Sequence, residues 1–348
     1  MFHIGTVYKL FIKVYRYCTA KYAYCVNIVK IDIKTMHDHS NDPQRAQHAL
    51  LLGLLAVTLF ALTLPMSKLA IGSAATPYLS PWFIAFGRAA VAGVLAIAYL
   101  YHTRAVWPKG RQWRYLLYIG LGNALGFPIL QSIGLLYVPS SHAAVFNGLL
   151  PLATAAIAAL LFRQHAPLRF WFWALLGAIL VMIFALWRAY QLDGALTLHY
   201  ADVLIFIAVL LCGYGYAYGA KLSRELPAAQ VLCWMLVLFL PLTAPASFLT
   251  LPKHAIPLSA WLGFAYVAVL SMWAGMMIWY HALHIGGAVR VSQVQIIQPF
   301  LTIMFSVPLL GERFEWLTVV FAAAVVWTAY MGKKVPIQTK ATHGKLSG

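Results

Sequence analysis

Long apolar stretches alternate with short polar ones along most of this chain. About 20 apolar residues in a helix cross the hydrocarbon core of a bilayer. The polar stretches between the apolar ones are too short to hold a soluble domain. We therefore predict an all-α integral membrane protein with ten transmembrane helices, at residues 49–70, 80–101, 114–136, 140–162, 168–188, 200–221, 228–250, 258–281, 290–310 and 315–332.

The second five predicted helices repeat the pattern of the first five. Pro151 and Pro299 each lie in an apolar helix that follows a small-residue turn, and they are 148 positions apart. Because a unit of five helices is odd in number, its second copy enters the membrane from the opposite side. The sequence thus predicts two inverted five-helix repeats, residues 49–188 and 200–332, the arrangement of many alternating-access carriers.

Composition agrees with a chain that lies almost entirely in a membrane. Hydrophobic residues make up 62% and charged residues 9%, with a mean hydropathy of +0.78, which excludes a water-soluble domain. The net charge of +17 raises the question of nucleic acid, but the basic residues are sorted by side. From Met36 onward, fourteen lie on the side of the two termini and four on the other, namely Lys68, Arg188, Lys253 and Arg313. This positive-inside bias predicts a plasma (inner) membrane protein with both termini cytoplasmic and no nucleic-acid partner.

The first 35 residues differ from the rest. Basic residues interrupt their apolar run every few positions, so the segment matches neither a membrane span nor a signal peptide. Our interpretation is that Met36 is the natural start and that residues 1–35 are over-translated or disordered; a basic amphipathic segment on a membrane surface is the alternative. The predicted cytoplasmic tails are residues 1–48 and 333–348.

The carboxy-terminal copy holds the clearest motifs. Ala282-Leu283 precedes a small-residue turn, Pro299 lies within the next helix, and Leu310-Gly311-Glu312-Arg313 follows. This order resembles the EamA domain of the drug/metabolite transporter superfamily. The amino-terminal copy keeps Pro151 but reads Phe162-Arg163-Gln164-His165 where the family usually has Gly-Glu-Arg, so no role is transferred to Gln164.

The resemblance covers residues 49–332, and Lys68 and Arg88 also stand at positions that look common in the family. It implies a ten-helix carrier made of two inverted halves that exports or exchanges small metabolites. The implied substrate is an amino acid or a related carboxylate or amphipathic compound. A nucleotide-sugar or phosphorylated-metabolite exchanger is the alternative.

The two repeat-related prolines point to a central site. A proline inside a helix frees a backbone carbonyl that lipid cannot satisfy, so Pro151 and Pro299 predict interrupted helices beside a substrate, or else packed kinks. Asn147 and Gln295 lie one turn before these prolines and are also 148 positions apart. Their amides, with that of Gln298, either bind a ligand or form hydrogen bonds between helices.

Basic residues in or near the spans are further candidates. Arg88 is eight residues into the second predicted span, where a charge costs about 2.5–3.5 kcal/mol. No acidic residue is predicted in the membrane core, so Arg88 binds carbonyl groups or an anionic substrate. Lys68 ends the first span and is either a snorkelling anchor or part of the pathway.

The remaining candidates share helix faces. Tyr214 and Tyr218 are four residues apart, Asn123 and Gln131 are eight apart, and Trp273 lies in the eighth span. Such side chains line a substrate pathway or simply pack between helices.

Signatures of enzymes are missing from the sequence. It has no paired aspartates in a span, no His-Glu pair and no phosphate-binding loop, which argues against an intramembrane enzyme or an ATP-driven pump. His281 and His284 form an incomplete metal site, and His142 at a span start is expected at the membrane interface. We expect no metal and no cofactor.

No carboxylate or histidine is predicted in the core to carry a proton. We therefore expect facilitated diffusion or exchange of a substrate with a carboxylate or phosphate, by rocking of the two five-helix halves. The expected partners are the small-molecule substrate and the bilayer, and the protein is expected to be a monomer or a homodimer.

Overall fold

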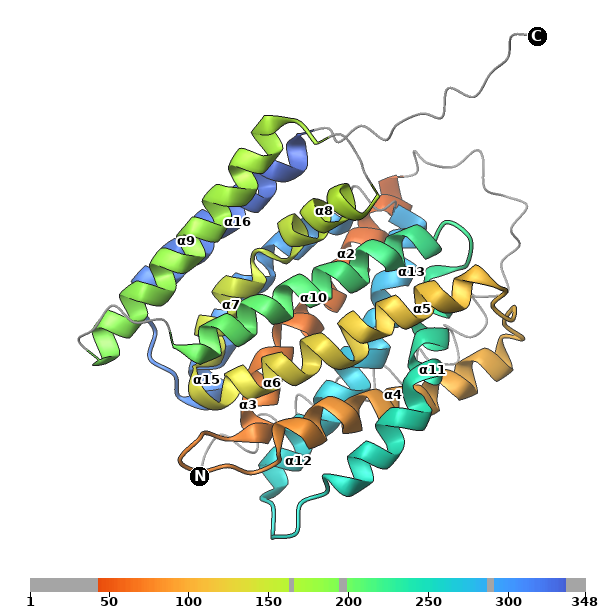
Figure 1. Ribbon diagram of the computed structural model, residues 1–348, viewed down its shortest axis with the longest axis horizontal. Helices are drawn as coiled ribbons and strands as arrows, with labels where there is room; N and C mark the ends of the chain where they lie inside the picture. The colour runs from red at the N-terminus through yellow and green to blue at the C-terminus, as the bar shows by residue number, and fades with distance from the viewer. Residues whose placement is uncertain (1–42, 163–165, 194–198, 287–290, 336–348) are drawn as a thin grey trace.

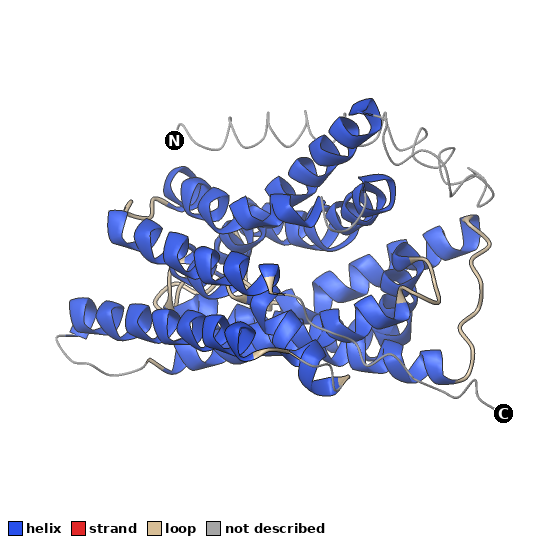
Figure 2. Ribbon diagram, turned by 90° about the horizontal axis from the view of Figure 1, so that it is seen from above, coloured by secondary structure: helices blue, strands red, loops and turns tan. Residues whose placement is uncertain are grey.

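The computed structural model describes residues 43–162, 166–193, 199–286 and 291–335, and the regular elements in these ranges are helices (Figures 1 and 2). The elements of the first half are α2 (Pro43–Ala61), α3 (Thr63–Ile71), α4 (Pro81–His102), α5 (Arg111–Gly120), η2 (Leu121–Gly126), α6 (Phe127–Tyr137), α7 (Ser140–Asn147), α8 (Leu150–Leu161) and α9 (Leu168–Asp193). Those of the second half are α10 (Tyr200–Leu222), α11 (Ala228–Leu249), α12 (Leu258–Ala265), η3 (Tyr266–Gly275), α13 (Met276–Gly286), η4 (Ser292–Ile297), α15 (Gln298–Leu310) and α16 (Trp316–Lys334). The segments 1–35 and 336–348, Arg163, Gln164 and His165 lie outside the described residues.

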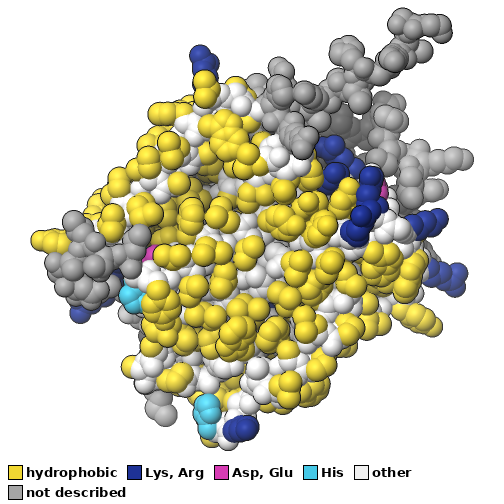
Figure 3. Space-filling view, viewed as in Figure 1, with side chains coloured by type: hydrophobic (Ala, Val, Ile, Leu, Met, Phe, Trp, Pro, Cys, Tyr) yellow, Lys and Arg dark blue, Asp and Glu magenta, His cyan; other side chains and the backbone are white. Residues whose placement is uncertain are grey.

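Eight helical segments among the described residues are long and apolar enough to cross a membrane. They coincide with the first eight predicted spans. Two shorter apolar helices, Val294–Leu310 and Trp316–Gly332, occupy the last two. Hydrophobic side chains also cover most of the visible surface (Figure 3). These features fit an integral membrane protein, and the count of ten spans stays a prediction.

The helices that contain the repeat-related prolines are interrupted. α7 ends at Asn147 and α8 begins at Leu150, while the 3-10 segment η4 ends at Ile297 and α15 begins at Gln298. Pro151 and Pro299 are each the second residue of the helix that follows. Proline fits there because the first turn of a helix needs no intrahelical partner for that N–H.

Widened π-helical turns occur in both halves. η2 divides α5 from α6, and η3 divides α12 from α13. Shifting η2 by 148 positions places it inside η3. The π segments therefore recur in the two halves at the same spacing as the helix interruptions beside Pro151 and Pro299. A π segment leaves the regular ladder of hydrogen bonds and often lies at a functional site.

Helix contacts divide most of the bundle into two groups. The first helix group comprises α5, η2, α6, α7 and α8 packed with α10, and the second comprises α2 and α3 packed with α12, η3, α13, η4 and α15. Each group combines helices from both halves of the chain. The groups contact each other where α3 and α15 approach α6 and α7, and the pairs α4–α11 and α9–α16 flank them (Figure 1).

Candidate functional site

A cavity of about 2880 Å³ lies between the two helix groups. Its lining reaches Tyr101, which is 86% exposed, and Trp107, which is 65% exposed, so the cavity is open there. In the opposite direction the lining stops at Ser132, Ala144 and Thr302, which are all at most 2% exposed. We call these limits the open end and the closed end.

Arg88 on α4 lines the cavity although it is only 8% exposed. Its Nε donates a hydrogen bond to the Met272 sulfur at 3.3 Å, and among the described residues it forms no ion pair. Cys212 and Tyr216 of α10 line the same cavity. A buried charge without a counter-ion is costly, so this guanidinium is suited to receive an anionic ligand.

Three amide side chains of the first helix group also line the cavity: Asn123 on η2, Gln131 on α6 and Asn147 on α7. The Oδ1 atoms of Asn123 and Asn147 are buried without a hydrogen-bond partner, as are both amide atoms of Gln131. Since most buried polar atoms in proteins are satisfied, four such atoms in one cavity indicate a place for ligand or water.

The second helix group supplies the opposite wall. Gln295 and Gln298 line the cavity there together with Pro299, and Pro151 faces them from α8. Trp273 of η3 also belongs to the lining. The spacing of 148 positions relates Asn147 to Gln295, and both residues border this one cavity.

Three candidates lie outside the lining. Lys68 donates hydrogen bonds from its Nζ to the carbonyl oxygens of Leu135 and Leu136, near the closed end. Tyr214 and Tyr218 pack instead against Tyr118, with ring centroids 6.4 and 4.9 Å away. Their role in the pathway stays a prediction.

Tyr216 was missed by sequence reasoning. It lines the cavity with Cys212 and Ala220, which are four residues to either side on α10. That spacing marks one helix face, but nothing local indicates which face of an apolar helix borders a cavity.

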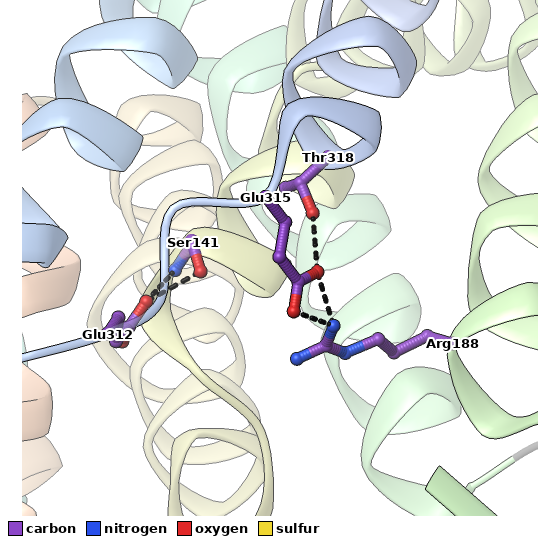
Figure 4. A network of polar contacts seen from close by, with 5 residues as sticks. All are labelled: Ser141, Arg188, Glu312, Glu315 and Thr318. Carbon is purple, nitrogen blue, oxygen red and sulfur yellow. Dashed lines mark hydrogen bonds and ion pairs between the residues drawn. The ribbon is translucent and has the colours of Figure 1, made fainter. Parts of the chain in front are cut away.

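A polar network holds the closed end together (Figure 4). Glu312, in the loop after α15, accepts hydrogen bonds from the backbone N–H groups of Ser140 and Ser141, at 2.7 and 3.0 Å. Both serine hydroxyls also donate to this carboxylate. Because the N-terminus of a helix carries partial positive charge, the carboxylate caps α7 favourably.

An ion pair lies beside this cap. Arg188 of α9 pairs with Glu315, which also accepts a hydrogen bond from Thr318 at 3.2 Å (Figure 4). The hydrogen bonds from Arg188 lower the pKa of the Glu315 carboxyl from its ordinary value of 4.5.

His142 and Asp202 form a buried pair at the same end. Their Nε2 and Oδ1 atoms are 2.6 Å apart, and the side chains are 3% and 5% exposed. The expectation of an interfacial His142 was wrong, because packing between α7, α9 and α10 encloses a residue that the sequence places at a span start. Within the described ranges no three His, Cys, Asp or Glu side chains gather to hold a metal ion.

Comparisons with known proteins agree with this architecture. Residues 47–187 and 199–331 each match the EamA-like transporter family. The chain belongs to this family. This match confirms the resemblance to the EamA domain and identifies the protein as a multi-pass membrane transporter, which points away from an enzyme.

One similar protein is an uncharacterized transporter, YdeK, of Bacillus subtilis (strain 168). It is 38% identical over 276 residues, which cover 79% of this chain and 93% of the relative. A solved structure titled only "Crystal structure of protein" has a TM-score of 0.53 at 20% identity, covering 83% of this chain and 99% of that one. The latter likeness concerns the fold alone.

Proposed function

We propose that this EamA transporter carries a small metabolite bearing a carboxylate or phosphate, with Arg88 as the anchor for the anion. The observation that carries the proposal is a buried guanidinium in the cavity that forms no ion pair with any described residue. A charge in such a place is usually kept for function, because it lowers stability unless a ligand compensates it.

The unsatisfied amides support a ligand with further polar groups. Asn123, Gln131 and Asn147 offer hydrogen bonds from one wall, and Gln295 and Gln298 line the other. An amino acid or a related carboxylate satisfies both the guanidinium and these amides. Sugar phosphates and nucleotide sugars also combine an anionic group for the guanidinium with polar groups for the amides, so the panel of solutes includes them.

Alternating access is the proposed mechanism. The cavity lies between the two helix groups, which contact each other at the closed end and are apart at the open end. We propose that these groups rock against each other, rather than the two sequence halves that the repeat alone suggests. The recurrence of the helix interruptions and the π segments at an offset of 148 supports an inverted repeat behind this motion.

Charge supports an orientation with the open end in the cytoplasm. Basic residues gather there on and before α5, including Arg104, Lys109, Arg111 and Arg114, and α10 carries Lys221 in its last turn. Figure 3 shows the largest cluster of Lys and Arg at that edge of the visible face. By the positive-inside rule, both termini then lie in the cytoplasm of a plasma-membrane protein, and loading from inside makes export the proposed direction.

The experiment is counterflow in proteoliposomes. Vesicles are preloaded with one solute from a panel of amino acids, deaminated carboxylates, sugar phosphates, nucleotide sugars and uncharged sugars, and uptake of the labelled solute is followed. We expect counterflow of at least one anionic or zwitterionic solute and none of the uncharged sugars. Counterflow restricted to uncharged solutes would overturn the proposal.

Arg88→Met tests the anchor in the same vesicles. Removing a charged hydrogen-bond donor costs about 1.5–3 kcal/mol, so affinity for the transported anion should fall about 10- to 100-fold. Arg224→Met removes an exposed arginine near the open end and is the matched control. Equal counterflow by both variants would exclude Arg88 as the anchor.

A further inference from the structure

A groove of about 670 Å³ lies outside the substrate cavity and is not explained by it. Apolar side chains of α2, η4 and α15 line this groove, among them Leu54, Ile297 and Phe300, and α16 contributes Tyr330 and Lys334. Leu54 and Ile297 are 41% and 42% exposed, so the groove is open to the surroundings of the protein. Leu54 is about two helical turns inside the apolar segment Gln47–Ile71, where those surroundings are the hydrocarbon of the bilayer.

The groove separates parts of the bundle that alternating access moves relative to each other. α2, η4 and α15 belong to the second helix group, whereas α16 packs mainly on α9 and also contacts α7 and α8 of the first group (Figure 1). α16 begins directly after Glu315 at the closed end and ends at Lys334. The groove therefore lies in the open half of the molecule, where the two groups are apart.

Only a thin wall divides the groove from the substrate cavity. Ile296 of η4 lines both spaces, and its neighbour Gln295 lines the substrate cavity. An occupant of the groove therefore contacts the segment that presents an amide to the substrate.

The lining of the groove indicates the chemistry of its occupant. Water needs polar partners, which apolar side chains such as Leu54 and Phe300 do not offer, whereas the acyl chain of a phospholipid fits such a lining. Lys334 is the one charged residue among the lining residues that the structure describes. Its Nζ lies 4.3 Å from the centroid of the Tyr330 ring, and it forms no ion pair with a described carboxylate. An ammonium at the end of an apolar groove matches the phosphate of a lipid headgroup.

We propose that an anionic phospholipid binds in this groove, with an acyl chain against η4 and its phosphate on Lys334, and holds the two helix groups apart at the open end. In the orientation proposed above this end lies in the cytoplasmic leaflet, which carries the anionic lipids. This inference rests on the proposed alternating access. It makes the balance between the two states of the transporter depend on the anionic lipid content of that leaflet.

Binding is tested with the full chain in a mild detergent. The protein is titrated with phosphatidylglycerol or with phosphatidylcholine of the same acyl chains, and the melting temperature is followed by tryptophan fluorescence, because a ligand of the folded state raises it. We expect phosphatidylglycerol to bind more tightly than phosphatidylcholine. Lys334→Gln should weaken phosphatidylglycerol about fivefold, whereas Lys334→Arg should retain it. Lys253→Gln, exposed at the closed end, is the matched control and should bind like the parent.

A second pair of variants tests the place of the acyl chain. Ile297→Trp narrows the groove and should weaken phosphatidylglycerol, whereas Val320→Trp adds the same ring on α16 outside the groove, at a residue that is 44% exposed. Equal affinity of these two variants would overturn the groove as the binding place. Equal affinity of the parent for both lipids, or an unchanged affinity of Lys334→Gln, would overturn the anionic site.

The effect on the helix groups is tested with the thiol of Cys212, which lines the substrate cavity and is reachable from the closed end only when that end opens. The full chain, with Cys18, Cys25 and Cys233 replaced by Ala, is reconstituted in phosphatidylcholine with or without phosphatidylglycerol. A membrane-impermeant maleimide is then added on the side that the closed end faces. Lys334→Gln in the same vesicles corrects for the influence of surface charge on the reagent.

We expect phosphatidylglycerol to slow labelling of the parent relative to Lys334→Gln by up to about fivefold, because the lipid favours the state in which the closed end is shut. A ratio that does not depend on phosphatidylglycerol would overturn the role of the lipid in holding the groups apart. No labelling in either kind of vesicle would overturn alternating access and this role together. The affinities measured in detergent need neither transport nor substrate, so the binding site itself is tested even then.

Discussion

The carboxylate of Glu312 lies 2.7 Å from the backbone nitrogen of Ser140, although 172 positions separate the two residues in the chain. The contact joins the loop after α15 to the first residue of α7, and so the second helix group to the first. Ser306 of α15 adds a hydroxyl contact to Ser140 at 2.7 Å. These contacts lie at the closed end, where alternating access requires the two groups to separate.

Glu312→Gln should therefore open the closed end more often. The amide keeps the shape but loses the charge that a helix N-terminus favours, which is worth about 0.3–2 kcal/mol. We expect faster maleimide labelling of Cys212 from the closed side, by up to about thirtyfold. The control is Glu225→Gln at the open end, where the Glu225 carboxylate accepts a hydrogen bond from Gln112. Labelling equally slow in both variants would show that Glu312 does not hold this end shut.

Gly215 should be intolerant of a side chain. A Cβ added there would lie 2.4 Å from the Asn123 Oδ1 atom, whereas one at Gly219, one turn later, would meet no atom within 4 Å. We expect Gly215→Ala to lower the melting temperature in detergent, since overpacking costs about 1–3 kcal/mol. Gly219→Ala should leave it unchanged or raise it, because alanine favours a helix over glycine by about 1 kcal/mol. Equal melting temperatures would contradict the close approach of α10 to η2.

The sequence predicts the helices well because hydropathy and proline placement are local properties. The interruptions before Pro151 and Pro299 follow from the missing N–H of proline. The repeat offset also relates Asn147 to Gln295, and the structure places both on one cavity. The sequence also predicts that Arg88 lacks an acidic partner, because no acidic residue falls in the core of a predicted span. Among the residues that the structure describes, Arg88 indeed forms no ion pair.

Other features depend on contacts between distant segments. His142 and Asp202 each stand at the start of an apolar stretch, where a polar residue ordinarily meets water, and only the packing of α7 on α10 buries them together. Tyr214 and Tyr218 share a face that the sequence indicates, but that face packs on α5, and Tyr216 turns to the cavity instead. Helical periodicity identifies faces and cannot tell which neighbour each face meets.

The paired amides are testable together. Asn147→Leu combined with Gln295→Leu removes hydrogen-bonding groups from both walls of the cavity, and we expect counterflow to fall about tenfold or more, because each lost hydrogen bond is worth about 0.5–1.5 kcal/mol. Gln112→Leu, near the surface of the open end, should keep its counterflow. Counterflow unaffected by the double change would remove the amides from the proposed site.

Acid should weaken the ion pair between Arg188 and Glu315. Hydrogen bonds from Arg188 hold the pKa of Glu315 below its ordinary 4.5 in the folded protein, so the unfolded chain binds this proton more readily. The stabilising contribution is therefore complete above about pH 4.5 and disappears as the pH falls through the lowered pKa. We expect Glu315→Gln to melt a few degrees below the parent at neutral pH, measured by tryptophan fluorescence in detergent.

That difference should shrink as the pH is lowered from neutral through the lowered pKa of Glu315, because the parent then loses the same charge. Thr318→Val removes a neutral donor to the same carboxylate and leaves the ion pair, so its deficit at neutral pH should be smaller. A deficit of Glu315→Gln that stays constant over this range would assign the role of Glu315 to packing around the start of α16 rather than to its charge.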